Sequence, residues 1–181
     1  MPVTYYPAVP GPVTRPVSAS SISPGSLAGV HLFPVFGALI GGKLVNLGTD
    51  TLMAGLIASG TFTWGPAPQT YEYVSQFLAG DGVNGALTEV STSGTGYSRL
   101  PLTGVTVSTS GAVNTLTCGN IVWPLVTISA SYAFFYDASA GSGDTSHPIL
   151  AYWDFGGPQP VSDNSFTLKP SASGLATWTS S

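Results

Sequence analysis

The stretch that decides the fold class is TISASYAFFYDASAGSGDTSHPILAYWDFGGP, residues 127–158. It holds two runs rich in β-branched and aromatic residues, Thr127 to Tyr136 and Ile149 to Phe155, and such residues favour strands. Between the runs, residues 138–146 consist of Gly, Ser, Ala, Thr and a single Asp, the composition of a surface loop. The Gly156-Gly157-Pro158 triplet predicts a turn after the second run. This stretch therefore predicts two strands joined by a loop.

The segments on either side show the same alternation of strand-like runs and turn signals. The runs cover Tyr71 to Val74, Ser98 to Val107, Val113 to Trp123 and Phe166 to Lys169. Short strands at spacings of roughly 8–12 residues are typical of sandwiches and barrels. We therefore predict a mainly β protein: a compact antiparallel β-sandwich, jelly-roll or immunoglobulin-like, over residues 44–181.

One short helix is expected at the start of this domain. Thr49 or Asp50 can cap its first turn, and Ser59-Gly60 can end it. Gly55 weakens the prediction, because glycine has a low helix propensity. The apolar residues that would share one face of this helix are Leu52, Met53, Leu56 and Ile57.

The first 34 residues contain seven prolines. Proline fixes φ and removes a backbone donor, so this segment predicts an extended, polyproline-like chain with few hydrogen bonds to itself. We expect residues 1–43 to form an N-terminal arm that another protein surface holds; an arm folded back on its own domain is the alternative. Aromatic and aliphatic residues bring contact area at low entropic cost. The expected anchors are Val3, Tyr5, Tyr6, Val9, Leu32, Phe33 and Phe36.

Charged residues make up only 7% of the chain, against about 25% in typical soluble domains, and 43% of the residues are hydrophobic. A surface of Ser, Thr, Gly and apolar groups is easily desolvated, which favours a protein that packs against other chains. Uncharged surfaces also occur in secreted β-sandwiches, which is the alternative. The formal charge of −4 and only four cations exclude the basic stripe that nucleic acid requires. The most apolar stretch, Leu27 to Ile40, is shorter than the roughly 20 residues that span a bilayer, so we expect no membrane partner.

Candidate catalytic groups are few. A Ser-His-Asp set can be assembled from Ser142 or Ser146 with His147 and Asp154, but the sequence offers no strand-turn-helix context for a nucleophile. His31 lies in an apolar stretch and is expected to be packed in the interior. We predict no catalytic residue, and we do not expect the chain to be an enzyme.

Metal, cofactor and disulfide chemistry has equally little support. The segment DASAGSGD, residues 137–144, lacks the alternating oxygen ligands and closing Glu of an EF-hand, so a turn between strands is the better interpretation. Cys118 is the single cysteine, which excludes an intrachain disulfide and favours cytosolic synthesis. No basic residue lies near Cys118 to activate its thiol, so we expect a buried small side chain. We predict no metal site and no cofactor.

A cluster of aromatic residues lies in the two runs of the opening stretch, and Trp123 lies in the run before it. Bulky groups on both faces of a strand indicate a central strand or a subunit contact. Binding of a sugar by an exposed aromatic platform is the alternative. We predict burial, because Trp123, Trp153 and Phe155 lie within strand-like runs and not at loop tips.

The layout resembles that of small structural proteins of tailed phages, of the head-decoration or minor tail type. The resemblance rests on the proline-rich start PVTYYPAVPGPVTRP (residues 2–16), on the Gly/Ser/Thr-rich segment TEVSTSGTGYSRLPLTGVTVSTSGAVN (residues 88–114), and on the scarcity of charge. It is a likeness of general character, so it assigns no functional residue position by position.

The resemblance implies a virion protein that is assembled in the host cytoplasm. We expect a capsid decoration protein, a homo-oligomer with a trimer favoured, that contacts the major capsid protein or neighbouring virion subunits through its arm. A minor tail, collar or fibre protein is the first alternative, with host-surface or carbohydrate binding as its function. A carbohydrate-binding module and a cell-wall hydrolase are the remaining alternatives.

Overall fold

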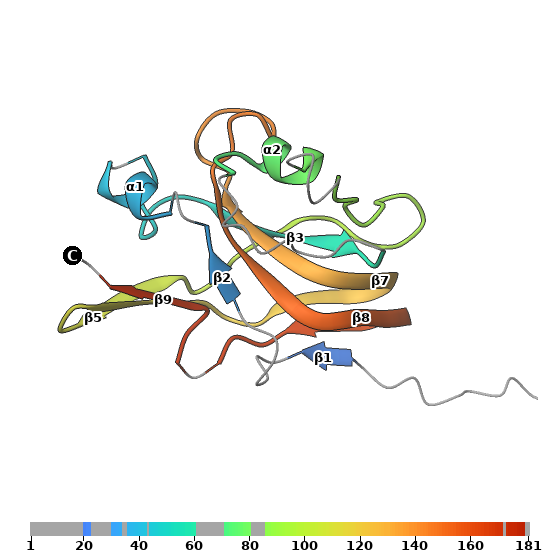
Figure 1. Cartoon of the computed structure of the whole chain (residues 1–181). Coiled ribbons are helices and arrows are strands. Elements are labelled where there is room, and N and C mark those ends of the chain that lie inside the picture. Colours follow the sequence, from blue (N-terminus) through green and yellow to red (C-terminus); the bar gives the residue numbers. More distant parts are fainter. Residues whose placement is uncertain are drawn as a thin grey trace, which may run out of the picture.

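The computed structural model describes residues 20–22, 30–33, 36–42, 44–60, 71–80, 86–171 and 173–179. Two sheets form its framework (Figure 1), which confirms the predicted β-rich sandwich. The larger sheet has the order β1-β8-β7-β3-β4, with β2 also paired to β8; the smaller has the order β5-β6-β9. The strands are β1 (Ser20–Ile22), β2 (Val30–Leu32), β3 (Leu52–Ala58), β4 (Leu100–Pro101), β5 (Thr106–Ser110), β6 (Val113–Thr117), β7 (Ile121–Asp137), β8 (Ile149–Leu168) and β9 (Ala176–Thr179). All pairings are antiparallel except that of β1 with β8.

The opening sequence stretch forms most of an unusually long hairpin. Strand β7 has 17 residues and β8 has 20, and their pairing runs from Ile121 opposite Leu168 to Tyr136 opposite Ile149. The loop between them lies where it was predicted. The turn predicted at residues 156–158 is wrong, because β8 continues through it.

The two glycines of that triplet serve a different purpose. The register shifts here: Ala130 lies opposite Gln159, whereas Tyr132 lies opposite Asp154. Strand β8 therefore has surplus residues that bulge out of the ladder. Gly156 and Gly157 have φ angles of 74° and 142°, which glycine adopts without a steric cost.

The helix predicted after Thr49 is also wrong, because Leu52–Ala58 is strand β3. It is paired with β7 on one side and with the short β4 on the other. Pairing on both sides satisfies its backbone groups and outweighs the helical spacing of its apolar residues. Leu52, Ala54 and Leu56 alternate into the main core and are fully buried.

Two short helices occur elsewhere, α1 (Phe36–Gly41) and α2 (Val74–Ala79). Helix α2 begins where the alternation of residues 71–74 predicted a strand. The side chain of Gln76 caps it: its Oε1 accepts hydrogen bonds from the backbone N–H groups of Glu72 and Tyr73, at 2.8 and 3.2 Å. Within the described part of the chain, neither helix has the length and apolar character needed to cross a lipid bilayer.

The folded unit includes residues that were assigned to the arm. Strand β2 pairs with β8, and Phe33 and Phe36 are each only 2% exposed. The expected boundary between residues 43 and 44 therefore lies inside the packed unit. The reason is hydrophobic: Phe36 and Leu39 are buried in the main core of this chain, and Leu32 packs against that core.

Strand β1 fixes where the N-terminal segment joins the fold. It runs parallel to the end of β8, with Ser20 opposite Phe166 and Ile22 opposite Leu168. Leu168 also pairs with Ile121, the first residue of β7, which directly follows β5 and β6 of the small sheet in the chain. The Ile22 end of β1 therefore points toward the small sheet, and the Ser20 end points away from it (Figure 1).

Candidate functional site

The structure does not assemble the Ser-His-Asp set. His147 Nδ1 lies 3.7 Å from Asp144 Oδ1, and its ring stacks on Tyr136 at a centroid distance of 5.3 Å. Asp154 instead accepts a hydrogen bond from the backbone N–H of Gly156, at 2.8 Å. Among the described residues, no hydrogen bond joins His147 to Ser142 or Ser146. The arrangement holds His147 by packing and supplies no nucleophile for it to activate.

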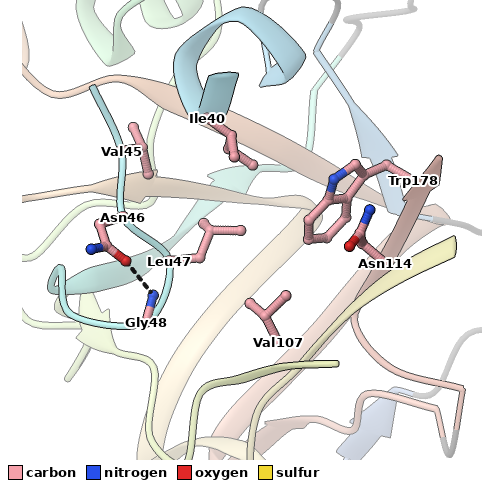
Figure 2. A pocket seen from close by; sticks show the side chains of 8 residues that line it. All are labelled: Ile40, Val45, Asn46, Leu47, Gly48, Val107, Asn114 and Trp178. Atoms are coloured by element: carbon pink, nitrogen blue, oxygen red, sulfur yellow. Dashed lines mark hydrogen bonds between the residues drawn. The ribbon is translucent and has the colours of Figure 1, made fainter. Parts of the chain in front are cut away.

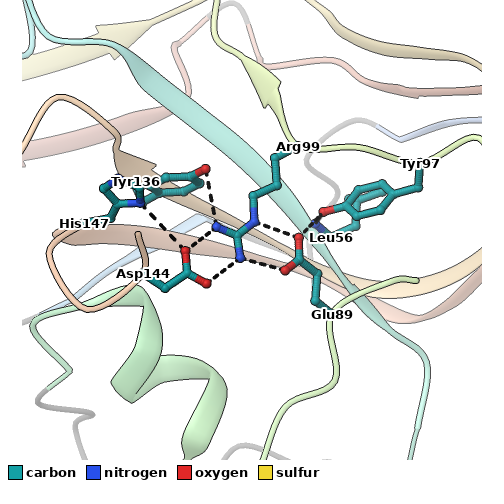
Figure 3. Close-up of polar contacts among 7 residues, drawn as sticks. All are labelled: Leu56, Glu89, Tyr97, Arg99, Tyr136, Asp144 and His147. Atoms are coloured by element: carbon teal, nitrogen blue, oxygen red, sulfur yellow. Dashed lines mark hydrogen bonds and ion pairs between the residues drawn. The ribbon is translucent and has the colours of Figure 1, made fainter. Parts of the chain in front are cut away.

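The most highly connected polar group is Arg99, which the sequence did not single out. Its guanidinium spans two carboxylates (Figure 3). Nε and Nη2 donate to Glu89 at 2.8 and 2.7 Å, and Nη1 and Nη2 donate to Asp144 at 2.5 and 2.8 Å. The guanidinium also lies 5.2 Å from the ring centroids of Phe134 and Tyr136. This is a bidentate clamp between three segments that are distant in the sequence.

The ionisation of the clamp is set by these contacts. Burial lowers the pKa of the Arg99 guanidinium, but the hydrogen bonds to Glu89 and Asp144 outweigh burial, so its pKa is raised. The same hydrogen bond from Arg99 is the main reason why the pKa of Asp144 is lowered. Arg99 and Asp144 are therefore both charged at neutral pH and form an ion pair.

Tyr97 connects the clamp to β3. Its hydroxyl donates to Glu89 Oε1 at 2.7 Å and accepts from the backbone N–H of Leu56 at 2.8 Å. Burial, followed by the negative charge of Glu89, raises the pKa of Tyr97 far above its usual value. The phenol therefore stays protonated and acts as a fixed bridge. The clamp and Tyr97 together are suited to holding segments in place, not to moving protons.

The structure also accounts for the two remaining candidate sites, the loop of residues 137–144 and Cys118. In the loop that superficially resembles a calcium loop, Asp144 is bound by Arg99 and Asp137 Oδ1 accepts from the backbone N–H of Ser139 at 2.7 Å. The described residues contain no group of three or more His, Cys, Asp or Glu side chains able to hold a metal ion. Cys118 is half-buried against the main core, and burial raises the pKa of its thiol to about 11.

The burial predicted for Trp123, Trp153 and Phe155 is confirmed, whereas Tyr132 and Tyr152 are half-buried. Trp123 and Trp153 are 1% and 0% exposed. Trp123 Nε1 donates to the carbonyl of Ser98 at 2.7 Å, so its polar edge is satisfied inside the protein. His31 differs from the expectation, because it is exposed and stacks on Tyr152 at a centroid distance of 4.9 Å.

An open groove with a volume of about 790 Å³ lies between helix α1 and the small sheet (Figure 2). The segment from α1 through residues 45–48 forms one wall, and the small sheet forms the other. Apolar side chains dominate the lining, and every lining residue is uncharged. The residues that line it are Ile40, Val45, Asn46, Leu47, Gly48, Val107, Asn114 and Trp178.

The pairing register of β5, β6 and β9 explains which side chains of the small sheet line the groove. Asn114 lies opposite Trp178, and Leu116 lies opposite Ala176, so these residues share one face of the sheet. Val107 pairs with Leu116 and lies on the same face. Trp178 packs edge-on against Phe36 at a centroid distance of 5.0 Å, which holds its ring at the groove.

The structure describes only three of the seven predicted arm anchors. Phe33 and Phe36 are core residues of this chain, so neither is accessible to a partner, which corrects that part of the expectation. Leu32 is half-buried within β2. The remaining anchors, Val3, Tyr5, Tyr6 and Val9, lie outside the described residues.

Comparison of the chain with protein-family models, with curated proteins and with solved structures gave no match.

Proposed function

We propose that this protein is a structural subunit of a tailed-phage virion, most specifically a capsid decoration protein that binds the head lattice beside other copies of itself. The observation that carries the proposal is the absence of charge over a large exposed surface. Residues 100–136 and 170–181 contain no Asp, Glu, Lys, Arg or His. The small sheet is built entirely from these two segments.

The outer face of the small sheet shows this surface most clearly. Strand β5 is exposed at all five residues, and the side chains that point away from the groove are Thr, Ser and Val: Thr106, Ser108, Ser110, Val113, Thr115, Thr117, Thr177 and Thr179. Hydroxyl and methyl groups cost little to desolvate, whereas soluble monomers use charge to stay apart. The outer edge of β5 carries no Lys, Pro or other blocking residue. These features support repeated contact with neighbouring protein.

The way in which the few charged residues are used also supports repeated contact with neighbouring protein. The chain has only four Lys and Arg residues, and Arg99 is bound to two carboxylates of the same chain. The proline-rich N-terminal segment provides a means of attachment, because a proline-rich chain loses little entropy on docking. Symmetric repetition on a lattice multiplies such contacts through effective concentration. A homotrimer on the head is the arrangement that we favour.

The test is a decoration assay on phage heads that lack this protein. Purified full-length chain is added to such heads, and bound copies are counted by gel densitometry and located by electron microscopy. Many copies spread over the head surface are expected. Absence of binding to heads would contradict the decoration proposal.

Copy number and location separate this proposal from its alternative. A small, fixed number of copies confined to one vertex or to the tail would identify a minor tail, collar or fibre protein. A second chain that lacks residues 2–17 keeps β1, β2 and α1, and therefore tests the N-terminal segment without removing any core residue that the structure describes. Full decoration by the truncated chain would show that this segment has no part in attachment.

A further inference from the structure

The groove has the chemistry of a site for a proline-rich peptide. Such sites combine an aromatic ring with apolar walls, so that proline rings pack against them, and a few polar donors that bond the solvated peptide carbonyls. Here Trp178 supplies the ring, and Val107 and Leu47 supply apolar surface from opposite walls. The volume of about 790 Å³ lies within the range of roughly 300–1,000 Å³ that is usual for binding sites.

Two amides provide the polar donors. Asn46 Oδ1 accepts from the backbone N–H of Gly48 at 3.1 Å, and Asn114 Oδ1 accepts from Thr109 Oγ1 at 2.8 Å. In each amide the oxygen is therefore engaged, and the NH₂ group is the part able to donate to a carbonyl in the groove. A polyproline-like chain offers such carbonyls, because it makes no internal hydrogen bonds.

The chain itself contains a segment that matches this groove. Residues 2–14, PVTYYPAVPGPVT, combine four prolines with Tyr and Val and carry no charge. An uncharged, apolar groove binds such a segment without desolvating an ion. In polyproline conformation the 19 residues that precede β1 would reach about 60 Å, at ~3.1 Å per residue.

The polarity of β1 favours the groove of a neighbouring copy over that of the same chain. Its Ser20 end, to which the segment is attached, points away from the small sheet that forms one wall of the groove. A chain that continued straight along the axis of β1 beyond Ser20 would lead away from the groove of its own copy. We propose that residues 2–14 of one copy bind in the groove of a neighbouring copy, so that adjacent subunits are linked arm to groove. This inference rests on the proposed function, in which copies lie side by side.

The experiment is a photo-crosslinking measurement on the full chain. The photoreactive amino acid p-benzoylphenylalanine replaces Tyr6, and unlabelled and ¹⁵N-labelled chains are mixed in equal amounts before irradiation. Mass spectrometry of the digest then identifies both the crosslinked residue and the isotope pairing. We expect crosslinks from position 6 to peptides that contain Asn46, Val107 or Trp178, with one labelled and one unlabelled partner. Groove crosslinks with matched isotopes only would overturn the assignment to a neighbouring copy, and absence of groove crosslinks would overturn the site.

A matched pair of variants tests the groove itself. Val107 and Val113 are both in the β5–β6 hairpin and are 41% and 43% exposed, but Val113 is on the face opposite the groove. Val107→Asp places a carboxylate in the groove and should lower the crosslink yield roughly tenfold or more. Val113→Asp should leave the yield unchanged, and equal yields in the two variants would overturn the proposal. Val107→Asp chains could also decorate heads normally although they no longer crosslink. That result would leave the decoration proposal unchanged and would reject a role of the groove in attachment.

Discussion

The ring of Phe134 lies directly over the Cα of Gly55, its partner in the neighbouring strand. A Cβ atom built on Gly55 would be 2.3 Å from Phe134 Cζ, a distance that side chains do not tolerate. Phe134 is itself fully buried, and Phe77 packs against it at a centroid distance of 5.5 Å, so the ring has no free space to move into. The glycine in the middle of β3 therefore makes room for a large aromatic ring.

Gly55→Ala should destabilise the protein, because the methyl group would overpack this contact. We expect the free energy of unfolding to fall by about 2–3 kcal/mol in urea titrations. Gly37→Ala is the control: Gly37 lies in α1, and a Cβ there would meet no atom within 4 Å. A Gly55→Ala protein as stable as the Gly37→Ala protein would show that Phe134 does not occupy this position.

Tyr97→Phe should remove the bridge between the clamp and β3. The backbone N–H of Leu56 would lose its acceptor, and Glu89 would lose a donor, although the ring volume is unchanged. Leaving a buried donor unpaired costs about 1–3 kcal/mol, so the unfolding midpoint should shift to lower urea concentration. An unfolding midpoint equal to that of the wild-type protein would show that the bridge contributes nothing to stability.

Arg99→Lys should weaken the clamp although the positive charge is kept. An ammonium group has three donors and no planar fork, so it cannot make the four hydrogen bonds that Arg99 makes to the two carboxylates. Because the clamp is only partly buried, with 20% of the Arg99 side chain exposed, we expect a loss of about 1–3 kcal/mol.

The pH dependence of stability gives a separate test of the clamp. The pKa of Asp144 is lowered in the folded protein from a usual value of 3.8, so its contribution is complete above that pH and is lost as the pH falls. The wild-type protein should therefore lose stability below about pH 4 more steeply than the Arg99→Lys protein. Parallel acid profiles of the two proteins would contradict the ion pair with Asp144.

Asp137→Asn should increase the free energy of unfolding at neutral pH, whereas Arg99→Lys should lower it. Asp137 is fully buried and its Oδ2 has no hydrogen-bond partner, so burial, together with Asp50, raises its pKa. Charging this carboxyl opposes folding, so wild-type stability should fall as the pH rises above 3.8. The variant removes the charge and should be more stable at pH 7, by on the order of 1 kcal/mol, with the gain disappearing in acid. A variant that is less stable at pH 7 would show that the charge is needed.

The sequence predicted the β-rich class and the β7–β8 hairpin because aromatic and β-branched residues are densest there. The errors fell where local patterns were ambiguous. Leu52, Met53, Leu56 and Ile57 have helical spacing, and only pairing on both sides makes their segment a strand. Likewise, Gly156 and Gly157 carry a turn signal, yet in this fold they accommodate a register shift inside a continuous strand.

The clamp and the groove could not be found from the sequence, because their residues are distant from one another along the chain. Glu89, Arg99 and Asp144 have no characteristic spacing, and only the folding of the loop after β7 brings Asp144 to Arg99. The one usable signal was the small number of cations. In a chain with only four Lys and Arg residues, an arginine within a strand-rich region is a candidate for an ion pair with a carboxylate of the same chain. The groove is formed by residues from four separate segments, among them the half-buried Trp178 close to the end of the chain.

The parallel pairing of β1 with β8 has a mechanical consequence. Tension applied to the chain at Ser20 acts along the axis of β1. The hydrogen bonds between β1 and residues 166–168 of β8 are then loaded together in shear, instead of being peeled apart one at a time. Strand β8 passes the load to β7 over the whole length of their pairing. A pull at this end of the fold is thereby resisted first by the three residue pairs of β1 with β8, which must yield together before the β7–β8 ladder is affected.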